Sequence, residues 1–371
     1  MKFLDCIQIS PPVSLVKGKI YSFIEMANVS TVFREPDSID VKAFSSGTKF
    51  EDGDTVIARI EPCLQNGKRF FVKGIGKGFG STEFLVFRPK TIDVDNKYLY
   101  YFMKTEYIQQ LMVSSMTGAT GRQRVNNDIF SDLEISLPDL PTQRRIASIL
   151  SAYDDLIENN RRQIKLLEEA AQRLYREWFV ELRFPGHESV KVVDGVPEGW
   201  MKVCLKDICE TKTGKKDANF GCDDGAYPFF TCAQAPIKAP SYSFDCSAVI
   251  LAGNGDFNVK LYRGKFEAYQ RTYVLSPANT EYLFLLYNAV RRNMNVLTKG
   301  ASGSTIKFLT KGMIDSIDLL IPSSQLLTTY NQNSEALQKS IEVLRRKIAL
   351  AVEARDRLLP RLMNHEMEVM L

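Results

Sequence analysis

The chain has 371 residues, 44% of them hydrophobic, which is enough to form two or more domains with sizeable cores. Its net charge of +4 is too small to indicate a nucleic-acid partner, so any such contact must come from local basic patches. Seven cysteines without a Cys-x-x-Cys spacing and two isolated histidines argue against a disulfide framework, a zinc site and a histidine-based triad. No apolar run is long enough for a membrane span, and we expect a cytoplasmic protein with reduced cysteines.

The first 140 residues predict short strands mixed with at least one helix. The segments "FEDGDTVIARI" (50–60) and "STEFLVFRP" (81–89) are typical of strands, and "NKYLYYFMKTEY" (96–107) predicts an amphipathic helix after a capping residue. We interpret the glycine-rich "GIGKGFGS" (74–81) as a hairpin loop, because it leads into a strand and not into a helix as a dinucleotide-binding loop would. "LEISLP" (133–138) predicts a short final strand that a proline ends.

A long helix with a heptad seam follows this region. Apolar or small residues recur at alternating steps of four and three, an average period of 3.5 that is typical of a coiled coil. They are Ile146, Leu150, Tyr153, Ile157, Ile164, Leu167, Ala171, Leu174 and Trp178. Asn160 occupies the remaining seam position, where a buried Asn can fix the register of the pairing. Trp178, Phe179 and Phe184 are expected to pack the end of the helix against the next domain, and Pro185-Gly186 to stop it.

The second half of the chain repeats the first at an offset of 184 positions. "IENNRRQIKLLEE" (157–169) corresponds to "IEVLRRKIALAVE" (341–353), and the helix at 96–107 corresponds to "TEYLFLLYNAVR" (280–291). The second seam keeps its register at Tyr330, Ser334, Leu337, Ile341, Leu344, Ile348, Ala351, Arg355, Leu358 and Leu362.

Further segments of the two halves also correspond. "LEISLP" aligns with "IDLLIP" (317–322), and "TGATG" (117–121) aligns with "KGASG" (299–303) after a two-residue gap. The strand segments at 50–60 and 81–89 align with "FDCSAVILAGN" (244–254) and "YQRTYVLSP" (269–277). The chain is therefore a tandem duplication of one unit, a globular domain followed by a long helix.

Two matched seams in a duplicated chain favour pairing of the two helices with each other, with packing of each helix on its own domain as the alternative. A duplicated unit closes on itself with two-fold pseudosymmetry, which makes the pair antiparallel. We predict an α+β fold with two similar mixed α/β domains separated by a pair of long antiparallel coiled-coil helices. The expected boundaries are 1–140 and 184–322 for the globular domains and 141–183 and 323–371 for the helices.

The chain lacks recognisable catalytic motifs. It contains no phosphate-cradling Gly-x-x-x-x-Gly-Lys-Ser/Thr string, and "SPPV" (10–13) lacks the aromatic residue found in the motif of DNA amino-methyltransferases. No cluster of carboxylates with a nearby lysine is typical of a nuclease. We therefore predict no catalytic residue and no metal site in this chain.

The central segment closely resembles the central conserved region of Type I restriction–modification specificity subunits. The resemblance rests on "LPDLPTQRRIA" (137–147), "IENNRRQI" (157–164) and "LYREWFVELRFPG" (174–186), followed by "PEGW" (197–200). The last helix resembles the distal conserved region more loosely, since "IPSSQLLTTYNQNSEAL" (321–337) lacks the Gln-Arg-Arg stretch.

The resemblance implies a DNA-reading subunit whose two globular domains are target recognition domains. Each domain would read one half of a split DNA target, and the helix pair would set their spacing. Expected partners are double-stranded DNA, two modification methyltransferase subunits and, through them, restriction–translocase subunits, without a membrane partner. S-adenosylmethionine, ATP and Mg²⁺ are expected in those subunits and no cofactor in this chain. A self-contained DNA adenine methyltransferase and a coiled-coil scaffold that does not bind DNA are the alternatives.

Basic and amide side chains in loops are the candidate DNA contacts, because Lys and Arg bind phosphates and Asn, Gln and Arg read base edges. In the first domain they are Arg59, Gln65, Asn66, Lys68, Arg69, Lys73, Lys77, Thr120, Arg122, Gln123 and Arg124. In the second they are Lys212, Lys215, Lys216, Asn254, Asn258, Lys260, Arg263, Arg271, Ser302, Ser304 and Lys307. Each of them has the alternative of a solvated loop residue.

Overall fold

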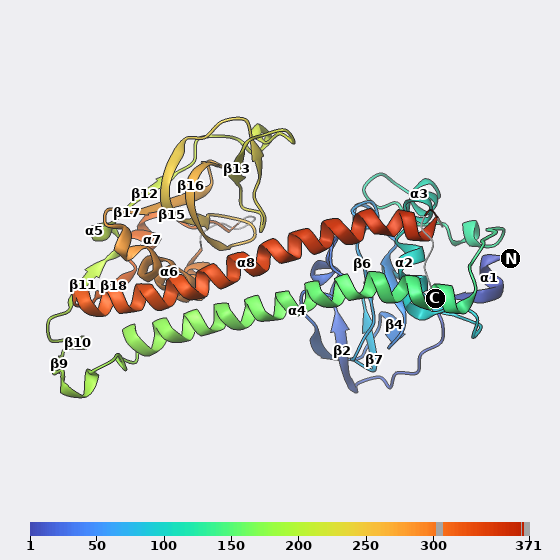
Figure 1. Ribbon diagram of the computed structural model, residues 1–371, viewed down its shortest axis with the longest axis horizontal. Helices are drawn as coiled ribbons and strands as arrows, with labels where there is room; N and C mark the ends of the chain where they lie inside the picture. Colours follow the sequence, from blue (N-terminus) through green and yellow to red (C-terminus); the bar gives the residue numbers. More distant parts are fainter. Residues whose placement is uncertain (302–306, 365, 367–371) are drawn as a thin grey trace. The chain divides into compact units, whose positions relative to one another are not determined.

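A computed structural model describes residues 1–301, 307–364 and 366 (Figure 1). The chain divides into two compact units. Unit 1 comprises residues 1–163 and the chain from residue 343 onward, and unit 2 comprises residues 164–342. In the described part of the chain, no helix is both long and apolar enough to cross a membrane.

Unit 1 contains two four-stranded sheets and short helices. The first sheet has the order β1-β8-β5-β6 and the second β3-β2-β7-β4. The strands are β1 (Ile7–Ile9), β2 (Ile20–Ile24), β3 (Asp40–Ala43), β4 (Thr48–Glu51), β5 (Thr55–Ala58), β6 (Arg69–Phe71), β7 (Lys77–Gly80) and β8 (Phe84–Pro89). The helices are α1 (Phe3–Cys6), α2 (Asn96–Met103) and α3 (Glu106–Ser114).

Unit 2 contains a six-stranded sheet, order β12-β17-β15-β16-β13-β14, and the pairs β11-β18 and β10-β9. The strands are β9 (Val192–Val193), β10 (Val196–Pro197), β11 (Met201–Cys204), β12 (Cys209–Thr213), β13 (Tyr227–Phe230), β14 (Ile237–Ala239), β15 (Phe244–Ala252), β16 (Val259–Ala268), β17 (Thr272–Pro277) and β18 (Asp318–Ile321). The helices are α5 (Leu205–Ile208), α6 (Leu283–Gly300) and α7 (Lys311–Asp315).

The two units share one strand order, as expected for a duplication. The antiparallel run β1-β8-β5-β6 of unit 1 corresponds to β12-β17-β15-β16 of unit 2. Each unit also contains one parallel pair, β2 with β7 and β13 with β16. The buried strands β5 and the end of β15 occupy the same place, which confirms the alignment of 50–60 with 244–254.

The predicted hairpin at 74–81 is wrong. Strand β6 pairs with β5, whereas β7 pairs with β2 and β4 in the other sheet. Gly74 and Gly76 adopt left-handed φ angles of +73° and +67°, a conformation that glycine tolerates and that breaks the strand between the two sheets. In unit 2 the corresponding strand stays continuous as β16.

The last predicted strand forms in only one half. "IDLLIP" contains β18, which pairs with β11. In "LEISLP" only an isolated bridge between Lys2 and Glu134 is present. The neighbouring hydrogen bonds are nevertheless equivalent, since Phe3 N donates to Leu133 O at 2.8 Å and Leu205 N to Ile317 O at 2.9 Å.

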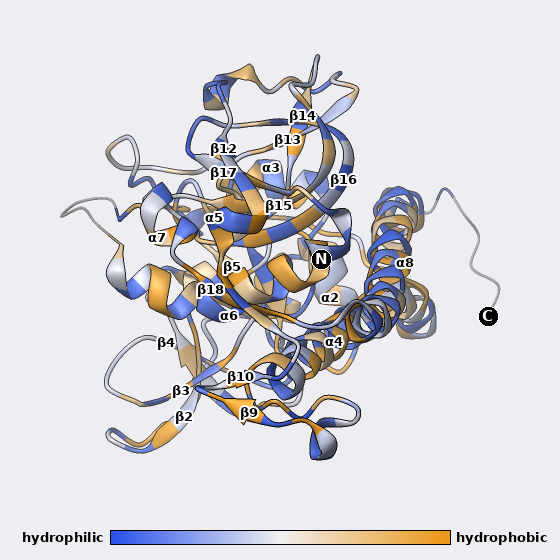
Figure 2. Cartoon of the chain, turned by 90° about the vertical axis from the view of Figure 1, so that its left-hand side faces the viewer, coloured by the Kyte–Doolittle hydropathy of each residue, from blue (hydrophilic) through white to orange (hydrophobic). Residues whose placement is uncertain are grey.

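The long helices are α4 (Leu140–Phe179) and α8 (Ser324–Met363). In unit 1 the start of α4, at Ile146 and Leu150, shares a core with Leu359 and Leu362 near the end of α8. In unit 2 the end of α4 meets the start of α8, where the rings of Trp178 and Tyr330 lie 5.8 Å apart. The helices therefore run antiparallel in each unit, as the duplication predicts. Both helices carry hydrophobic as well as hydrophilic residues, as the view nearly along them shows (Figure 2).

A side-chain cap fixes where α2 begins. The Asp95 carboxylate accepts hydrogen bonds from the backbone N–H groups of Lys97 and Tyr98, which fixes the first turn of α2. The predicted aromatic packing beyond α4 is confirmed, because Phe179 and Phe184 pack on Trp200 with ring centroids 5.6 and 4.6 Å apart.

Candidate functional site

Three loops of unit 1 converge at the end of β5. Arg59 N donates to Glu83 O at 2.8 Å, and Val125 N donates to Arg59 O at 3.0 Å. Glu61 N donates to Gln123 O at 3.0 Å. These bonds join residues 59–61, 81–83 and 117–125, which we call loop cluster 1.

Charged side chains stiffen loop cluster 1. The Arg124 guanidinium contacts both carboxylate oxygens of Glu83, at 2.7 and 2.9 Å. These hydrogen bonds lower the pKa of Glu83, so the carboxylate stays ionised at neutral pH. The Arg59 guanidinium donates to Val125 O at 3.3 Å. Thr120 and Arg122 lie beside them with exposed side chains.

The equivalent loops of unit 2 converge with the same backbone hydrogen bonds. Gly253 N donates to Arg271 O at 2.8 Å, and Leu309 N donates to Gly253 O at 2.8 Å. A side chain at Gly253 would place its Cβ 2.5 Å from Arg271 O, so only glycine permits this approach. We call residues 213–216, 231–234, 253–258, 269–273 and 307–309 loop cluster 2. They enclose a cavity of about 150 Å³ lined by Thr213, Gly253, Asn254, Gln270, Arg271, Tyr273, Phe308 and Leu309.

Hydrogen bonds also hold the loop of residues 231–234 in loop cluster 2. Cys232 Sγ donates to Asn254 Oδ1 at 2.9 Å, and Asn258 Nδ2 donates to Cys232 O at 2.9 Å. Lys260 Nζ donates to Ala233 O at 2.8 Å. Burial lowers the pKa of Lys260 to about 8, against the opposing attraction of Asp256 and Cys232. Asn258 and Lys260 therefore hold the loop in place, and both side chains are half-buried.

The two loop clusters bring together many of the predicted contacts. Loop cluster 1 contains Arg59, Thr120, Arg122, Gln123 and Arg124, and Gln65 and Asn66 are exposed in the turn that leads from it to β6. Loop cluster 2 contains or adjoins Lys215, Lys216, Asn254, Asn258, Lys260, Arg271 and Lys307. Ser302 and Ser304 lie outside the described residues.

Other predicted residues lie away from the clusters. Lys73 pairs with Asp155 of α4 at 3.4 Å, and Arg263 pairs with Glu335 of α8 at 2.7 Å. The remaining three are Lys68, whose Nζ donates to Met26 O, Lys77 at the start of β7, and Lys212, which pairs with Glu210 on β12.

The prediction that Arg69 contacts DNA needs correction. Its side chain is buried, and its guanidinium donates to the Met103 carbonyl oxygen and to Oε1 of Gln109. Burial lowers the pKa of Arg69, as expected for a cation removed from water. Arg69 therefore stabilises the packing of β6 against the helices and is not available to a phosphate.

Sequence reasoning missed the acidic and uncharged members of the clusters. Glu61, Glu83, Cys232 and Tyr273 contribute although the expected DNA contacts are mainly basic and amide side chains. Gln270 also lines the cavity, and its amide is not among the expected contacts. The repeat contained a signal for one of them, because aligning 81–89 with 269–277 places Glu83 at the position of Arg271.

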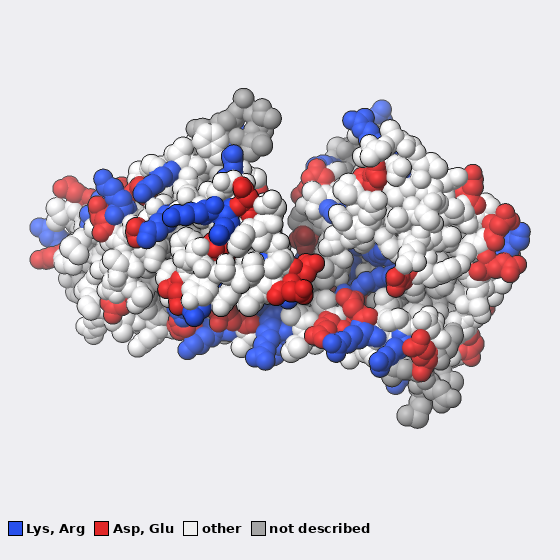
Figure 3. All heavy atoms as spheres, turned by 90° about the horizontal axis from the view of Figure 1, so that it is seen from above, with Lys and Arg blue, Asp and Glu red and all other residues white. Residues whose placement is uncertain are grey.

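The described residues contain no group of three or more His, Cys, Asp or Glu side chains that could hold a metal ion. On the face shown in Figure 3, acidic and basic side chains are interspersed, which agrees with the small net charge. The arrangement offers hydrogen-bond donors and acceptors on fixed loops.

Comparison with known proteins gives a consistent result. A family model described as "Type I restriction modification DNA specificity domain" matches residues 16–169 and 197–343. The Type I restriction enzyme EcoDI specificity subunit of Escherichia coli is 43% identical over 149 residues, which are 40% of this chain and 33% of that protein. The MjaIX specificity subunit of Methanocaldococcus jannaschii is 24% identical over 303 residues, 74% of this chain and 70% of that protein.

A solved structure is similar over nearly the whole length. The crystal structure of the Type I restriction–modification system S subunit from M. genitalium matches with a TM-score of 0.58 and 16% identity. The match covers 98% of this chain and 95% of that one, so the two share their fold.

Proposed function

Because the chain belongs to the family of Type I restriction modification DNA specificity domains, we propose that it is the DNA specificity subunit of a Type I restriction–modification complex. In this proposal the target recognition domains are residues 1–140 and 184–322, and residues 141–183 and 323–371 form the helical spacers. Loop cluster 1 reads one half of a split DNA target and loop cluster 2 reads the other.

One observation carries this proposal: the two clusters share a backbone frame but carry different side chains. Arg59 N to Glu83 O in unit 1 corresponds to Gly253 N to Arg271 O in unit 2, and both distances are 2.8 Å. At equivalent positions the frame presents a carboxylate in Glu83 and a guanidinium in Arg271. A common backbone arrangement that carries a hydrogen-bond acceptor in one domain and a donor in the other suits two domains that recognise different base sequences.

The chemistry of the exposed side chains fits base edges and phosphates. A guanidinium such as that of Arg122 or Arg271 can donate two hydrogen bonds to guanine, and amides such as Gln65 and Asn66 can pair with adenine. The carboxylate of Glu83 can accept from cytosine only when Arg124 is displaced, so in the free protein it positions Arg124.

Catalysis belongs to the partners in this proposal. The helices scaffold two methyltransferase subunits, which supply S-adenosylmethionine, and through them the translocase–nuclease subunits, which supply ATP and Mg²⁺. The chain itself reads DNA, has no cofactor of its own and works in the cytoplasm.

Selection of bound duplexes from a random pool tests the proposal. The complex assembled with its methyltransferase is compared with complexes that carry Arg122→Ala or Arg271→Ala, and all three are first checked for equal thermal unfolding. We expect Arg122→Ala to relax one half of the selected motif and Arg271→Ala the other half. Relaxation of both halves by one substitution, or of neither half by both, would refute the assignment of one cluster to each half-site.

Two alternatives predict other results. Methyl transfer from S-adenosylmethionine to DNA by the purified chain alone would identify a self-contained methyltransferase. Absence of any sequence preference in the assembled complex would identify a scaffold without a role in reading DNA.

A further inference from the structure

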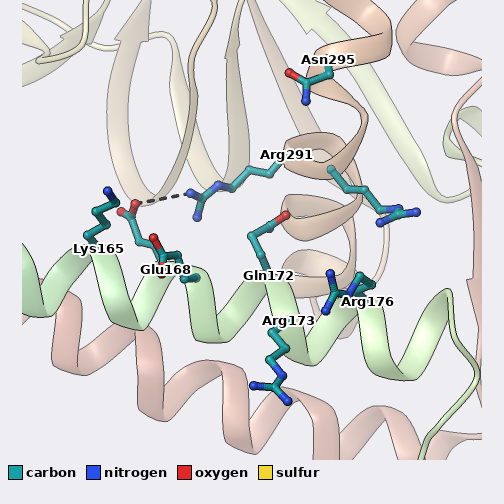
Figure 4. A pocket seen from close by; sticks show the side chains of 9 residues that line it. Lys165, Glu168, Gln172, Arg173, Arg176, Arg291 and Asn295 are labelled. Carbon is teal, nitrogen blue, oxygen red and sulfur yellow. Dashed lines mark hydrogen bonds and ion pairs between the residues drawn. The ribbon is translucent and has the colours of Figure 1, made fainter. Parts of the chain in front are cut away.

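Helices α4 and α6 of unit 2 enclose an open groove of about 600 Å³ (Figure 4). Every side chain that lines it is charged or carries an amide: Lys165, Glu168, Glu169, Gln172, Arg173, Arg176, Arg291, Arg292 and Asn295. Five of these nine are basic and two are acidic, so the groove carries a local excess of positive charge in a chain that is nearly neutral overall.

The sequence of α4 explains how the cations reach one side of the helix. Lys165, Glu169, Arg173 and Arg176 follow steps of four, four and three, which place side chains on one helical face. Gln172 lies on the same side, and its Nε2 donates to Asn288 Oδ1 of α6 at 2.8 Å. This hydrogen bond stabilises the packing of α4 against α6 beside the groove.

An equivalent groove in unit 1 provides an internal control. It has a volume of about 770 Å³, and Tyr107, Val352, Asp356 and Pro360 in its lining stand 184 positions from Arg291, Glu168, Gln172 and Arg176. The hydrogen bond between Gln172 and Asn288 is replaced there by the ion pair of Asp356 with Lys104, at 3.0 Å. The helices therefore pack in the same way in both units.

The cations of the unit 2 groove are not needed for this packing. In unit 1, Lys165 corresponds to Ala349, Arg176 to Pro360 and Arg291 to Tyr107. Only Arg173 keeps its charge, as Arg357, which pairs with Glu353 at 2.7 Å. The unit 1 groove is lined by two basic side chains, Lys104 and Arg355, and two acidic ones, Glu106 and Asp356, so packing shared by the two grooves does not explain the five basic side chains in unit 2.

The carboxylates of the groove offset only part of its charge. Arg291 reaches across from α6 to Glu168 of α4, with Nη2 and Oε2 3.4 Å apart (Figure 4). Arg173 and Arg292 have exposed side chains and extend the positive surface on the two helices. Guanidinium groups on both walls of an open groove suit a ligand with several phosphates, because each fork can donate two hydrogen bonds to one phosphate.

We propose that this groove binds phosphates of duplex DNA next to the bases that loop cluster 2 reads. The inference rests on the proposed function and adds a sequence-independent contact to it. A protein partner is a poorer match, because a docking surface for protein ordinarily has an apolar centre and this lining contains no apolar side chain.

The path of α6 supports a ligand shared with loop cluster 2. The helix continues from Arg292 to its end at Gly300, and Leu297 in this stretch belongs to the same hydrophobic core as Leu309 of loop cluster 2. Eight residues of helix span about 12 Å, the length of three to four base pairs of duplex at ~3.4 Å each. A duplex that extends three to four base pairs beyond loop cluster 2 is therefore long enough to follow this stretch of α6.

Titration of the full chain with short duplexes tests the proposal. The substitutions Arg173→Gln and Arg292→Gln are combined, and Arg357→Gln, at the position equivalent to Arg173, is the matched control. We expect the double variant to bind all duplexes several-fold more weakly in low salt and to flatten the plot of log K against log salt by roughly 1.8, about 0.9 for each lost phosphate contact. The ratio between target and non-target duplexes should stay unchanged, and the control should match the wild type.

Further arms distinguish the ligand sources. Unchanged affinity and salt slope in the double variant would overturn the proposal, as would an equal loss in Arg357→Gln. Weaker binding of polyglutamate with unchanged DNA affinity would also overturn it, in favour of an acidic protein partner. If millimolar inorganic phosphate competes for the groove as well as duplex DNA does, the groove is a site for free phosphate, and the DNA assignment is overturned. A failure of the proposed function differs from these outcomes, because it removes the target preference of the wild type and leaves the groove contribution measurable.

Discussion

A buried ion pair in the helix pair of unit 1 leads to a quantitative prediction. Arg355 Nη1 lies 2.6 Å from Asp154 Oδ1, and both side chains are 1% exposed. The Tyr101 hydroxyl donates to the other carboxylate oxygen at 2.5 Å. At the equivalent positions of unit 2 stand Gln338 and Ala171, so the same two helices pair there without a buried charge at this level.

Arg355→Met should lower the free energy of unfolding by about 3–5 kcal/mol, because it leaves the Asp154 carboxylate buried without its cation. The Tyr101 hydroxyl continues to donate, which places the expected loss near the lower end of that range. Combining Arg355→Met with Asp154→Asn removes both charges and keeps similar volumes. This double variant should regain most of the loss and lie within about 1 kcal/mol of the wild type.

Urea unfolding of the full chain measures these differences when two signals are followed. Both tryptophans, Trp178 and Trp200, belong to the aromatic core of unit 2, whereas helical circular dichroism reports both units. We expect the Arg355→Met transition to move to lower urea in circular dichroism, with a smaller or later change in fluorescence. A double variant as unstable as the single one, or a single variant within 1 kcal/mol of the wild type, would refute the reasoning that the cost comes from an unpaired buried charge.

Three further expectations follow from individual side chains. Arg69→Met should lower the free energy of unfolding, measured by denaturation, by about 1–3 kcal/mol, because the Met103 carbonyl oxygen and Oε1 of Gln109 lose their donor. A variant that loses only DNA affinity would contradict the buried role of Arg69. Burial lowers the pKa of Lys104 to about 8 from an ordinary value near 10.5. Between pH 8 and 10.5 the unfolded chain therefore binds more protons than the folded chain, so the free energy of unfolding increases with pH in this range. Lys104→Gln should remove that increase in denaturation curves taken at pH 8 and pH 10, and parallel curves for the two proteins would show that Lys104 is not the cause. Gly253→Ala should weaken base discrimination at one half-site, because the added Cβ would lie 2.5 Å from Arg271 O and push two loops of loop cluster 2 apart. An unchanged motif in duplex selection would contradict this prediction.

The duplication, the seams and the antiparallel pairing could be predicted from the sequence because each depends on a local or periodic pattern. A period of 3.5 fixes which helical face is apolar, and Ile146, Ile157, Tyr330 and Ile341 are all buried as expected. The same repeat predicts that both domains share a strand order. It also aligned Glu83 with Arg271, although the importance of that pair emerged only from the hydrogen bonds of the two clusters.

Long-range packing decided the features that the sequence patterns missed. Arg69 faces the Met103 carbonyl and not water because of contacts with residues distant in sequence. The residues next to Arg69 in the chain do not indicate these contacts. The strands at 69–71 and 77–80 are close in sequence, but they join different sheets because β6 pairs with β5 and β7 pairs with β2 and β4. The sequence alone determined the period, the repeat and the kinds of side chain available. Only the tertiary structure decided which loops meet at Arg59 and Gly253, because their backbone N–H and C=O groups find partners far along the chain.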